Sequence, residues 1–474
     1  MRRAKIVATL GPATSSIESI RALIAAGMDV ARLNLSHGGH ADHAKAFAQV
    51  RQCADEVGRG VGILVDLQGP KIRLGRFVGG SVLLEAGAEF IVTTEDVPGD
   101  VKMVSTSYAD LPRDAHLGHR VLVDDGRITL EVTAVDGPRV VTRVVEGGRV
   151  SDNKGFNLPG VAVSVPAMSE KDMDDLRWAL RIGADMIALS FVRSAADIKD
   201  VHRIMSEEGV HLPVLAKVEK PQAVDNLEEI VEAFDGVMVA RGDLGVELPL
   251  EAVPLVQKRA IQMCREVSKP VIVATQMLDS MMSATRPTRA EVSDVANAVL
   301  DGADALMLSG ETSIGAHPGL VIETMSRIIE HVELGALASL PPLIDDRQGS
   351  TARALTHAAV GVADEIEATH LIAFTETGLS ARLIARWRNQ TPLLAFTPSS
   401  RVRSQLSLVW GVETFLVTGV THTDDMVAQV DQALLDIGRA MAGDRVVIVA
   451  GVPPGVPGTT NGMRVHSIGS GPRG

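Results

Sequence analysis

The stretch that decides the fold runs from residue 213 to residue 312, where four short apolar runs each end in polar residues. The runs read PVLAKVE (213–219), GVMVARGD (236–243), PVIVATQM (270–277) and ALMLSGET (305–312). Amphipathic helical segments lie between them, at 222–234, 255–267 and 289–300. Strands that alternate with helices predict a parallel sheet, and runs that are apolar on both faces predict that helices cover it.

The same alternation extends outward from this stretch. On its N-terminal side lie strand-like runs at 5–11, 29–37, 62–69 and 186–192, with helical segments at 15–26, 40–57, 172–182 and 195–208. A last helical segment covers 320–332. Eight strand–helix units are the signature of a (β/α)8 barrel, so we expect the α/β fold class with this barrel at its centre.

Two further regions have a sequence pattern that differs from that of the barrel. Between 70 and 165 the runs are short and β-branched, and pairs such as Asp136-Gly137 supply the positive φ of tight hairpin turns. After a linker-like stretch at 334–350, four strand-like runs alternate with helices. The predicted domains are a barrel (1–69 and 166–340), an inserted small all-β, barrel-like domain (70–165) and a C-terminal α/β domain (351–474).

Composition narrows the class of protein. The 474 residues are 46% hydrophobic and 22% charged, which excludes disorder as the main state. A net charge of −13 argues against a dedicated nucleic-acid binder. No signal-peptide pattern stands at the N-terminus, and no apolar run approaches the roughly 18 residues that a membrane span needs. With only Cys53 and Cys264 as thiols, we expect a cytoplasmic protein with no membrane partner.

Polar residues gather where the predicted strands end. In a (β/α)8 barrel the C-terminal strand ends converge on the face that holds the active site. Alternate residues of a strand share a face, so Lys217 and Glu219 point the same way, as do Arg32, Asn34 and Ser36. The full set of strand-end residues is Arg32, Asn34, Ser36, His37, Asp66, Lys217, Glu219, Arg241, Gly242, Asp243, Thr275, Gln276, Ser309, Gly310, Glu311 and Thr312.

Part of this set describes a site for a divalent metal and an anion. The carboxylates are Glu219 and Asp243, and the cations are Arg32 and Lys217. Carboxylates suit Mg²⁺, and cations aimed at phosphoryl oxygens stabilise charge during phosphoryl transfer. Two structural alternatives stay open. Glu311 and Thr312 could merely cap the next helix, and Lys217 with Glu219 could form a structural ion pair.

Seven motifs together resemble the pyruvate kinase family, in the same order, over essentially the whole chain. They are Ala8-Thr9-Leu10-Gly11-Pro12, Arg32-Leu33-Asn34-Leu35-Ser36-His37-Gly38, the Asn153–Gly160 segment, Lys217-Val218-Glu219, Ala240-Arg241-Gly242-Asp243-Leu244-Gly245, Ala274-Thr275-Gln276-Met277-Leu278 and Leu308-Ser309-Gly310-Glu311-Thr312. The resemblance implies transfer of a phosphoryl group from phosphoenolpyruvate to ADP, giving pyruvate and ATP in the final step of glycolysis. It also implies that the β domain is a lid.

The resemblance assigns a role to each matching position. Lys217 would stabilise the phosphoryl group in flight, Arg32 would bind it, and Thr275 would lie beside the enolate. Gly242 and Asp243 would bind the substrate carboxylate, and Glu219 and Asp243 would hold Mg²⁺, for which Mn²⁺ could substitute. The nucleotide-side positions are Asn34, Ser36, His37, Arg73 and Lys154.

One motif departs from the commoner family pattern. Many members read Asp-Thr-Lys-Gly-Pro-Glu here and bind K⁺, whereas this chain reads Asp66-Leu67-Gln68-Gly69-Pro70-Lys71. Asn34, Ser36 and Asp66 keep the K⁺-ligand types, but Leu67 has lost the hydroxyl. The sequence resembles a subgroup that needs no K⁺, with Lys71 as the substitute cation. The alternative is that Lys71 points into solvent.

A loop of the C-terminal domain carries the last candidate site. Thr375, Thr377 and Ser380 place hydroxyls between a strand end and a helix start, where free N–H groups favour phosphate. The family uses this loop for a phosphorylated sugar or nucleotide effector and is usually a homotetramer. A plain capped helix is the alternative.

Two other functions compete with this interpretation. A Mg²⁺-dependent aldolase or lyase acting on a pyruvate enolate would share the barrel and the carboxylates, but it would need neither the lid nor Arg73 and Lys154. A catalytically silent regulatory protein would not need Lys217, Glu219, Asp243 and Thr275 intact. Formation of pyruvate that depends on ADP distinguishes the three.

Overall fold

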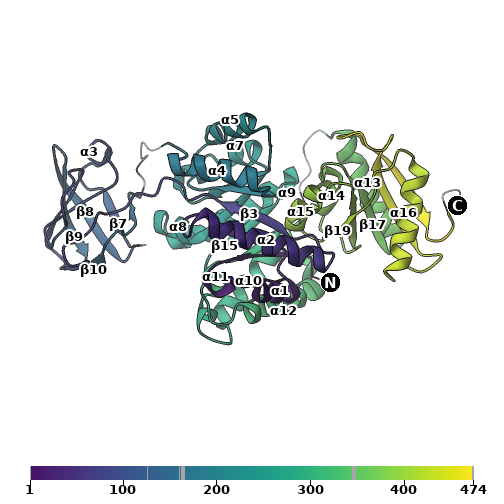
Figure 1. Ribbon diagram of the computed structural model, residues 1–474, viewed down its shortest axis with the longest axis horizontal. Helices are drawn as coiled ribbons and strands as arrows, with labels where there is room; N and C mark the ends of the chain where they lie inside the picture. The colour runs from purple at the N-terminus through teal and green to yellow at the C-terminus, as the bar shows by residue number, and fades with distance from the viewer. Residues whose placement is uncertain (1, 125, 160, 162–165, 344–348, 472–474) are drawn as a thin grey trace.

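The computed structural model describes residues 2–124, 126–159, 161, 166–343 and 349–471. In this part of the chain, eight parallel strands close into a barrel at the centre of the molecule (Figure 1). Around the barrel the order is β1, β16, β15, β14, β13, β12, β3, β2. The strands are β1 (Lys5–Thr9), β2 (Val30–Asn34), β3 (Gly62–Asp66), β12 (Met186–Leu189), β13 (Val214–Val218), β14 (Gly236–Ala240), β15 (Val271–Ala274) and β16 (Ala305–Leu308).

Helices surround the barrel and bury the outer face of its strands. They are α1 (Ile17–Ala26), α2 (His40–Glu56), α4 (Glu170–Ile182), α5 (Ile198–Glu208), α6 (Pro221–Asp225), α7 (Leu227–Ala233), α8 (Arg241–Glu247), α9 (Val253–Val267), α10 (Arg289–Asp301), α11 (Gly310–Ser313) and α12 (Pro318–Ala336). Leu215 packs with Met238 in the cluster that fills the barrel, while Val214 and Ala216 pack in the outer cluster with the helices. The strands are therefore buried on both faces, as their continuous apolar runs predict.

Helix boundaries follow local capping chemistry. Ser169 accepts a hydrogen bond from the N–H of Asp172 at the start of α4, and Asp172 bonds back to the N–H of Ser169. Thr288 and Glu291 form the same reciprocal pair at the start of α10. Such capping boxes satisfy the backbone donors that a helix start leaves without partners.

The inserted region forms a separate β-rich body at one end of the barrel, on the left of Figure 1. One sheet has the order β11, β7, β8, β9, β5, β6, and β4 pairs with β10. The elements are β4 (Ser81–Leu84), β5 (Glu89–Thr93), β6 (Met103–Ser105), α3 (Leu111–Asp114), β7 (Arg120–Val123), β8 (Ile128–Asp136), β9 (Arg139–Glu146), β10 (Gly148–Ser151) and β11 (Phe156–Asn157). Phe90, Leu130 and Val140 belong to a core of its own.

The C-terminal region forms an α/β body at the opposite end of the barrel (Figure 1). Its sheet has the order β19, β18, β17, β20, β21. The elements are α13 (Thr351–Glu365), β17 (His370–Phe374), α14 (Leu379–Ala385), β18 (Leu393–Thr397), α15 (Ser400–Gln405), β19 (Val412–Leu416), α16 (Thr423–Asp436), β20 (Arg445–Gly451) and β21 (Thr460–Ser467). The three parts together confirm the predicted fold class.

Two expectations differ from the structure in this half of the chain. The edge strand β21 was not expected; it pairs antiparallel with β20. The predicted linker begins inside α12, which continues to Ala336. The helix is held there because the Glu333 carboxylate accepts hydrogen bonds from the N–H groups of Arg3 and Ala4, both at 2.7 Å. The domain boundaries stay predictions, and residues 162–165 and 344–348 lie outside the described residues.

Two features of the whole chain complete the description. Within the described ranges, no helix combines the length and apolar character needed to cross a membrane. Cys53 and Cys264 are both buried free thiols.

Candidate active site

Four charged side chains meet at the C-terminal ends of neighbouring barrel strands. Arg32 lies on β2 and Asp66 ends β3, and their side chains join through Nε and Oδ2 at 2.7 Å. Lys217 lies on β13, with its Nζ 3.3 Å from Asp66 Oδ1 and 2.9 Å from Oε1 of Glu219. The structure thus brings together two cations and two carboxylates that the sequence places at the ends of three different strands.

These four groups are almost completely withdrawn from water. Glu219 is 1% exposed and Lys217 is 9% exposed. Buried charges are costly unless they are paired and hydrogen-bonded. The ion pair between Lys217 and Glu219, which was the structural alternative, is present in the structure. Its position at the C-terminal strand ends is also where (β/α)8 barrels carry their active sites.

Burial and mutual attraction set the charge of the cluster. Burial alone would lower the pKa of Lys217, but the carboxylates of Asp66 and Glu219 outweigh it and raise that pKa above its ordinary value. Burial, together with the charge of Asp243, raises the pKa of Glu219 to about 7, against the opposing effect of Lys217. Burial also acts to raise the pKa of Asp66, but Lys217 and Arg32 lower it overall. Lys217 therefore stays cationic.

A serine that sequence reasoning missed holds Lys217 in place. Ser190, directly after β12, accepts a hydrogen bond from Lys217 Nζ at 2.7 Å and donates one to the Leu67 carbonyl at 2.7 Å. The next N–H, that of Phe191, donates to Glu219 Oε2 at 2.8 Å. Ser190 and Phe191, at the C-terminal end of β12, thus orient both members of the Lys217–Glu219 pair. The sequence signal for Ser190 was its position at the end of a predicted barrel strand.

The ends of β14 and β15 form the neighbouring wall. The chain turns from β14 into the short helix α8 at Arg241, so Gly242 and Asp243 lie in a first helical turn rather than on the predicted strand. The Gly242 N–H donates to Thr275 Oγ1 at 2.7 Å. Thr275 itself has φ = 71°, a left-handed conformation that is strained for a β-branched residue. Such strain is typical of residues held for function.

Arg241 braces this wall. Its guanidinium binds both oxygens of Asp294 at 2.7 Å and the carbonyl of Thr275 at 2.8 Å. With its N–H groups engaged in this way, Arg241 positions the turn that carries Gly242 and Asp243.

A large cleft opens beside Arg32. It has a volume of about 720 Å³. The predicted nucleotide-side residues Asn34 and His37 line it, whereas Ser36, Arg73 and Lys154 do not. Lining residues that sequence reasoning did not single out are Thr14, Ser15, Asp42, His43, Lys45, Ala46, Gln49, Ser313 and Ile314. Most of the cleft is therefore formed by loops and by α2. The α2 residues match no sequence motif, so the sequence did not indicate that they line a cleft.

Arg73 and Lys154 belong to the β domain. Arg73 donates to the carbonyl of Asn153 at 3.0 Å, and Lys154 Nζ lies 2.7 Å from Asp124 Oδ1. Ser36 is held locally, because its N–H donates to Asn34 Oδ1 at 3.2 Å. The structure therefore leaves Arg73 and Lys154 outside the cleft, on the part of the chain that resembles a lid.

Lys71 lies at the junction of the β domain and the barrel. It is exposed, and it lines a cavity of about 40 Å³ together with Asp243, Arg193 and Lys220. Leu67, which replaces a hydroxyl of the K⁺-binding pattern, is 1% exposed and packs in the main core. The Lys71 ammonium can therefore approach the Asp243 side of the site, while Leu67 offers no oxygen ligand.

The donor set fits a hard divalent cation that takes much of its coordination from substrate and water. Glu219 Oε1 and Asp66 Oδ1 are buried and have no hydrogen-bond partner, although both lie near Lys217. Within the described ranges, no group of three or more His, Cys, Asp and Glu side chains forms a closed metal site. Mg²⁺ is commonly bound by one or two carboxylates plus substrate oxygens, so the pair Glu219 and Asp243 is compatible with it.

Glu311 and Thr312 are engaged with backbone groups. Glu311 accepts hydrogen bonds from the N–H groups of Ser309 and Leu278 at 2.7 and 3.2 Å. The Thr312 hydroxyl donates to the carbonyl of Thr9 at 2.9 Å. Both residues are buried. These contacts favour the structural alternative for this pair.

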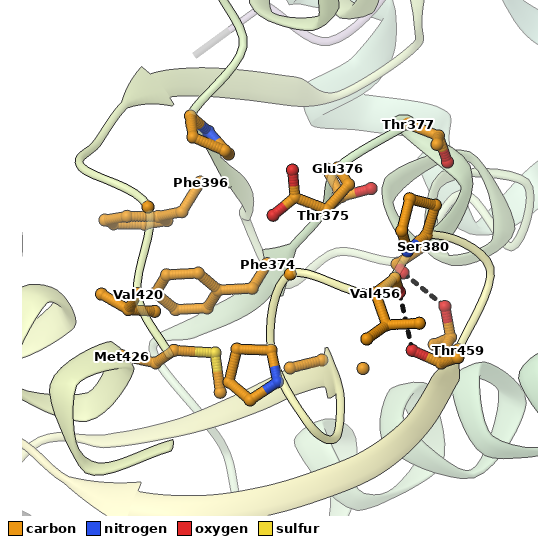
Figure 2. A pocket seen from close by; sticks show the side chains of 18 of the residues that line it. Phe374, Thr375, Glu376, Thr377, Ser380, Phe396, Val420, Met426, Val456 and Thr459 are labelled. Carbon is orange, nitrogen blue, oxygen red and sulfur yellow. Dashed lines mark hydrogen bonds between the residues drawn. The ribbon is translucent and has the colours of Figure 1, made fainter. Parts of the chain in front are cut away.

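The candidate effector loop borders a separate cavity of about 50 Å³ in the C-terminal domain, shown in Figure 2. Thr375 Oγ1 accepts a hydrogen bond from the Gly378 N–H at 2.8 Å, and the Ser380 hydroxyl lies 2.6 Å from that of Thr460. Thr375, Thr377 and Ser380 all line the cavity, opposite Phe374, Phe396 and Met426. Among its described lining residues there is no Lys or Arg, and Glu376 adds a carboxylate. A phosphate here would therefore rest on hydroxyl and backbone N–H groups.

Comparison with known proteins gives full-length matches. The family model "Pyruvate kinase, barrel domain" matches residues 1–322, and "Pyruvate kinase, alpha/beta domain" matches residues 353–466. A pyruvate kinase of Mycobacterium intracellulare is 58% identical over 468 residues, covering 99% of both chains. One from Corynebacterium glutamicum is 56% identical over 469 residues, covering 99% of this chain and 98% of its own. A crystal structure of a pyruvate kinase from Cryptosporidium parvum superposes with a TM-score of 0.92 at 36% identity, covering 98% and 96% of the two chains.

Proposed function

The chain belongs to the pyruvate kinase family, and on that premise we propose that the strand-end site carries out the family's reaction. The protein is a phosphotransferase that moves a phosphoryl group from phosphoenolpyruvate to ADP, giving pyruvate and ATP. The observation that carries our assignment of the site is the buried Lys217 ammonium, fixed between Ser190, Asp66 and Glu219 at the strand ends.

Lys217 and Arg32 handle the phosphoryl group. Both are buried cations anchored on carboxylates, so their positions are set before substrate arrives. Charge that develops on the oxygens in transit is stabilised by such preorganised groups without further rearrangement. Lys217 stabilises the phosphoryl group in flight, and Arg32 binds it on the side that faces the nucleotide cleft.

Glu219 and Asp243 hold Mg²⁺, or Mn²⁺ in its place. The family generally uses Mg²⁺, and the ion supplies charge neutralisation and orientation of substrate oxygens. On the protein side, the Phe191 N–H fixes one Glu219 oxygen, and Lys217 lies beside the other.

The substrate carboxylate lies against the first turn of α8. The backbone N–H groups of Gly242 and Asp243 belong to this first turn, and the Gly242 N–H donates to Thr275 Oγ1. We infer that this N–H turns to the substrate carboxylate on binding. The Thr275 hydroxyl, which also donates to the Ala274 carbonyl at 2.6 Å, then lies beside the enolate carbon that receives a proton.

The nucleotide occupies the cleft lined by Asn34 and His37. Arg73 and Lys154 complete this site only if the β domain approaches the barrel, whereas Ser36 already lies on the barrel, just after β2. Closure of a lid excludes water from the transferring group and suppresses hydrolysis. Because an aldolase or lyase would need no ADP, pyruvate formation that requires ADP tests this assignment.

Independence from K⁺ is the first prediction. Lys71 carries a permanent positive charge to the Asp243 side of the site, and Leu67 removes one oxygen ligand for a monovalent ion. We expect near-full turnover in buffer free of K⁺ and NH₄⁺, with a large organic counter-ion. Lys71→Glu should lower activity there, and added K⁺ should restore part of it, more so with Leu67→Thr. If the wild-type enzyme instead requires millimolar K⁺, Lys71 does not replace the ion, and Asn34, Ser36 and Asp66 are its expected ligands.

Regulation through the Thr375–Arg382 loop is the second prediction. We expect sigmoidal saturation by phosphoenolpyruvate, made more hyperbolic by a phosphorylated sugar or nucleotide. Ser380→Glu places a negative charge beside Thr460, where phosphate would bind, and should abolish the activation while leaving basal turnover.

Saturation curves with a panel of phosphorylated metabolites measure this effect. Ser470→Glu, which adds the same charge at an exposed position, is the control. A normal response of Ser380→Glu to every activating metabolite would reduce the loop to a helix cap.

Assembly and location follow from the family and are likewise proposals. We propose a homotetramer that works in the cytoplasm, where glycolysis takes place. Sedimentation velocity at micromolar concentration measures the assembly, and a monomer would contradict it.

A further inference from the structure

A small cavity lies between the barrel and the C-terminal domain, on the side of the barrel away from the catalytic strand ends. It is bordered by the residues just before β15 and β16, by the end of α9 and by the end of α14. Its volume is about 10 Å³, which is close to the space needed for one water-sized sphere. The lining residues are Arg265, Ser268, Lys269, Pro270, Asp304, Arg382, Ala385, Arg386, Arg388 and Val409.

The lining is strongly cationic among the described residues. Four arginines and a lysine face one carboxylate, that of Asp304. Asp304 is already engaged: Arg388 Nη2 lies 2.9 Å from Oδ2, and the N–H groups of Trp410 and Val271 donate to its two oxygens at 3.0 and 3.2 Å. Asp304 therefore neutralises Arg388 and has little left for the other cations.

Arg265 is a buried cation for which the described lining residues supply no counter-charge at ion-pair distance. It is 2% exposed, and its Nη1 donates to the carbonyl of Pro341 at 2.9 Å. Among the described residues, no carboxylate lies within ion-pair distance of its guanidinium. Burial, and then the neighbouring charge of Arg388, lower the pKa of Arg265 to about 10, which is consistent with an uncompensated site.

Three buried donors on this lining also lack acceptors. They are Nε of Arg265, Nε of Arg388 and the hydroxyl of Ser268. Buried donors without partners are rare in folded proteins, and each is an indication of a bound water or ion. Three of them around one cavity, next to an unneutralised guanidinium, point to a single negatively charged occupant.

We propose that this cavity binds one small monovalent anion of the size of chloride, held by Arg265, Arg388 and Ser268. A water molecule would satisfy the donors but would leave the charge of Arg265 uncompensated. Sulfate and phosphate are larger than chloride and would require a larger displacement of the lining. The bound anion joins α9 of the barrel to the segment that follows α14, so it fastens the C-terminal domain to the barrel independently of the catalytic site.

Anomalous diffraction and thermal unfolding test this proposal. Crystals of the full chain grown or soaked in sodium bromide should show an anomalous peak within hydrogen-bonding reach of Arg265 and Ser268. In solution, the Tm of the wild-type protein should rise with chloride and saturate, relative to gluconate at equal ionic strength, because a ligand that binds only the folded state stabilises it by mass action. Arg265→Met should remove this chloride-specific rise.

The control is Arg203→Met, which removes an exposed arginine on α5 and should leave the chloride response unchanged. Ser268→Ala should shift the response to higher chloride concentration. Absence of the bromide peak, or an equal response to chloride and gluconate, would show that water fills the cavity. If Arg265→Met does not fold, the bromide peak and the Ser268→Ala titration decide the question.

Discussion

Lys217→Met should lower kcat by about 10³-fold or more while changing the KM for phosphoenolpyruvate only modestly. Removing one preorganised donor to a developing negative charge typically costs about 10²–10³-fold in kcat, and Lys217 supplies a full charge. The side chain is buried, and three groups (Ser190, Asp66 and Glu219) fix its ammonium. Neither solvent nor a neighbouring residue can therefore take its place. Steady-state kinetics at saturating Mg²⁺ measure the effect.

The control for this variant addresses folding. Without Lys217, Asp66 keeps Arg32 as a partner, but Glu219 loses its nearest cation, so some loss of stability is expected. Circular dichroism and Tm therefore accompany the kinetics. Lys199→Met makes the same change at an exposed position on α5 and should keep full activity. If a folded Lys217→Met variant keeps near-wild-type turnover, Lys217 does not stabilise the phosphoryl group during transfer.

Glu219→Gln should raise the Mg²⁺ concentration needed for half-maximal activity by about 100-fold. Loss of even a supporting group around a metal costs about 10–100-fold in affinity, and here a charged ligand is lost from a site with few protein ligands. Asp243→Asn should act in the same direction. Titration of activity with Mg²⁺, and of the protein alone with Mn²⁺ by electron paramagnetic resonance, measures the two effects.

Matched variants separate metal binding from a general loss of charge. Glu207→Gln alters an exposed carboxylate on α5 that pairs with arginines, and it should leave the Mg²⁺ requirement unchanged. If the Mg²⁺ and Mn²⁺ titrations are unchanged in both Glu219→Gln and Asp243→Asn, these two carboxylates do not bind the metal.

The barrel and the core of the site could be predicted because they depend on local patterns. A strand that is buried on both faces has a continuous apolar sequence, and its last residues lie at one end of the barrel. This logic alone brought Lys217, Glu219 and Arg32 together. The Lys217–Glu219 ion pair, which the sequence left open as a structural alternative, is present at 2.9 Å.

The parts that were missed depend on contacts between distant segments. Ser190 has no motif of its own, and its role appears only when β12 lies beside β3 and β13. β21 has an exposed face at the sheet edge, so its sequence carries little apolar signal. The end of α12 was mistaken for linker because its stabilising partners, Arg3 and Ala4, are some 330 residues away in the chain. The cation-rich cavity beside Asp304 likewise joins two domains.

Phosphorus NMR of the wild-type protein with phosphoenolpyruvate, ADP and Mg²⁺ tests the central claim most directly, namely that this site passes the phosphoryl group to ADP without releasing it to water. The account predicts that the phosphoenolpyruvate signal is replaced by the γ-phosphate signal of ATP in equal amount, that omission of ADP stops the reaction, and that Lys217→Met suppresses it. Accumulation of inorganic phosphate, turnover without ADP, or ATP formation by Lys217→Met at the wild-type rate would contradict it.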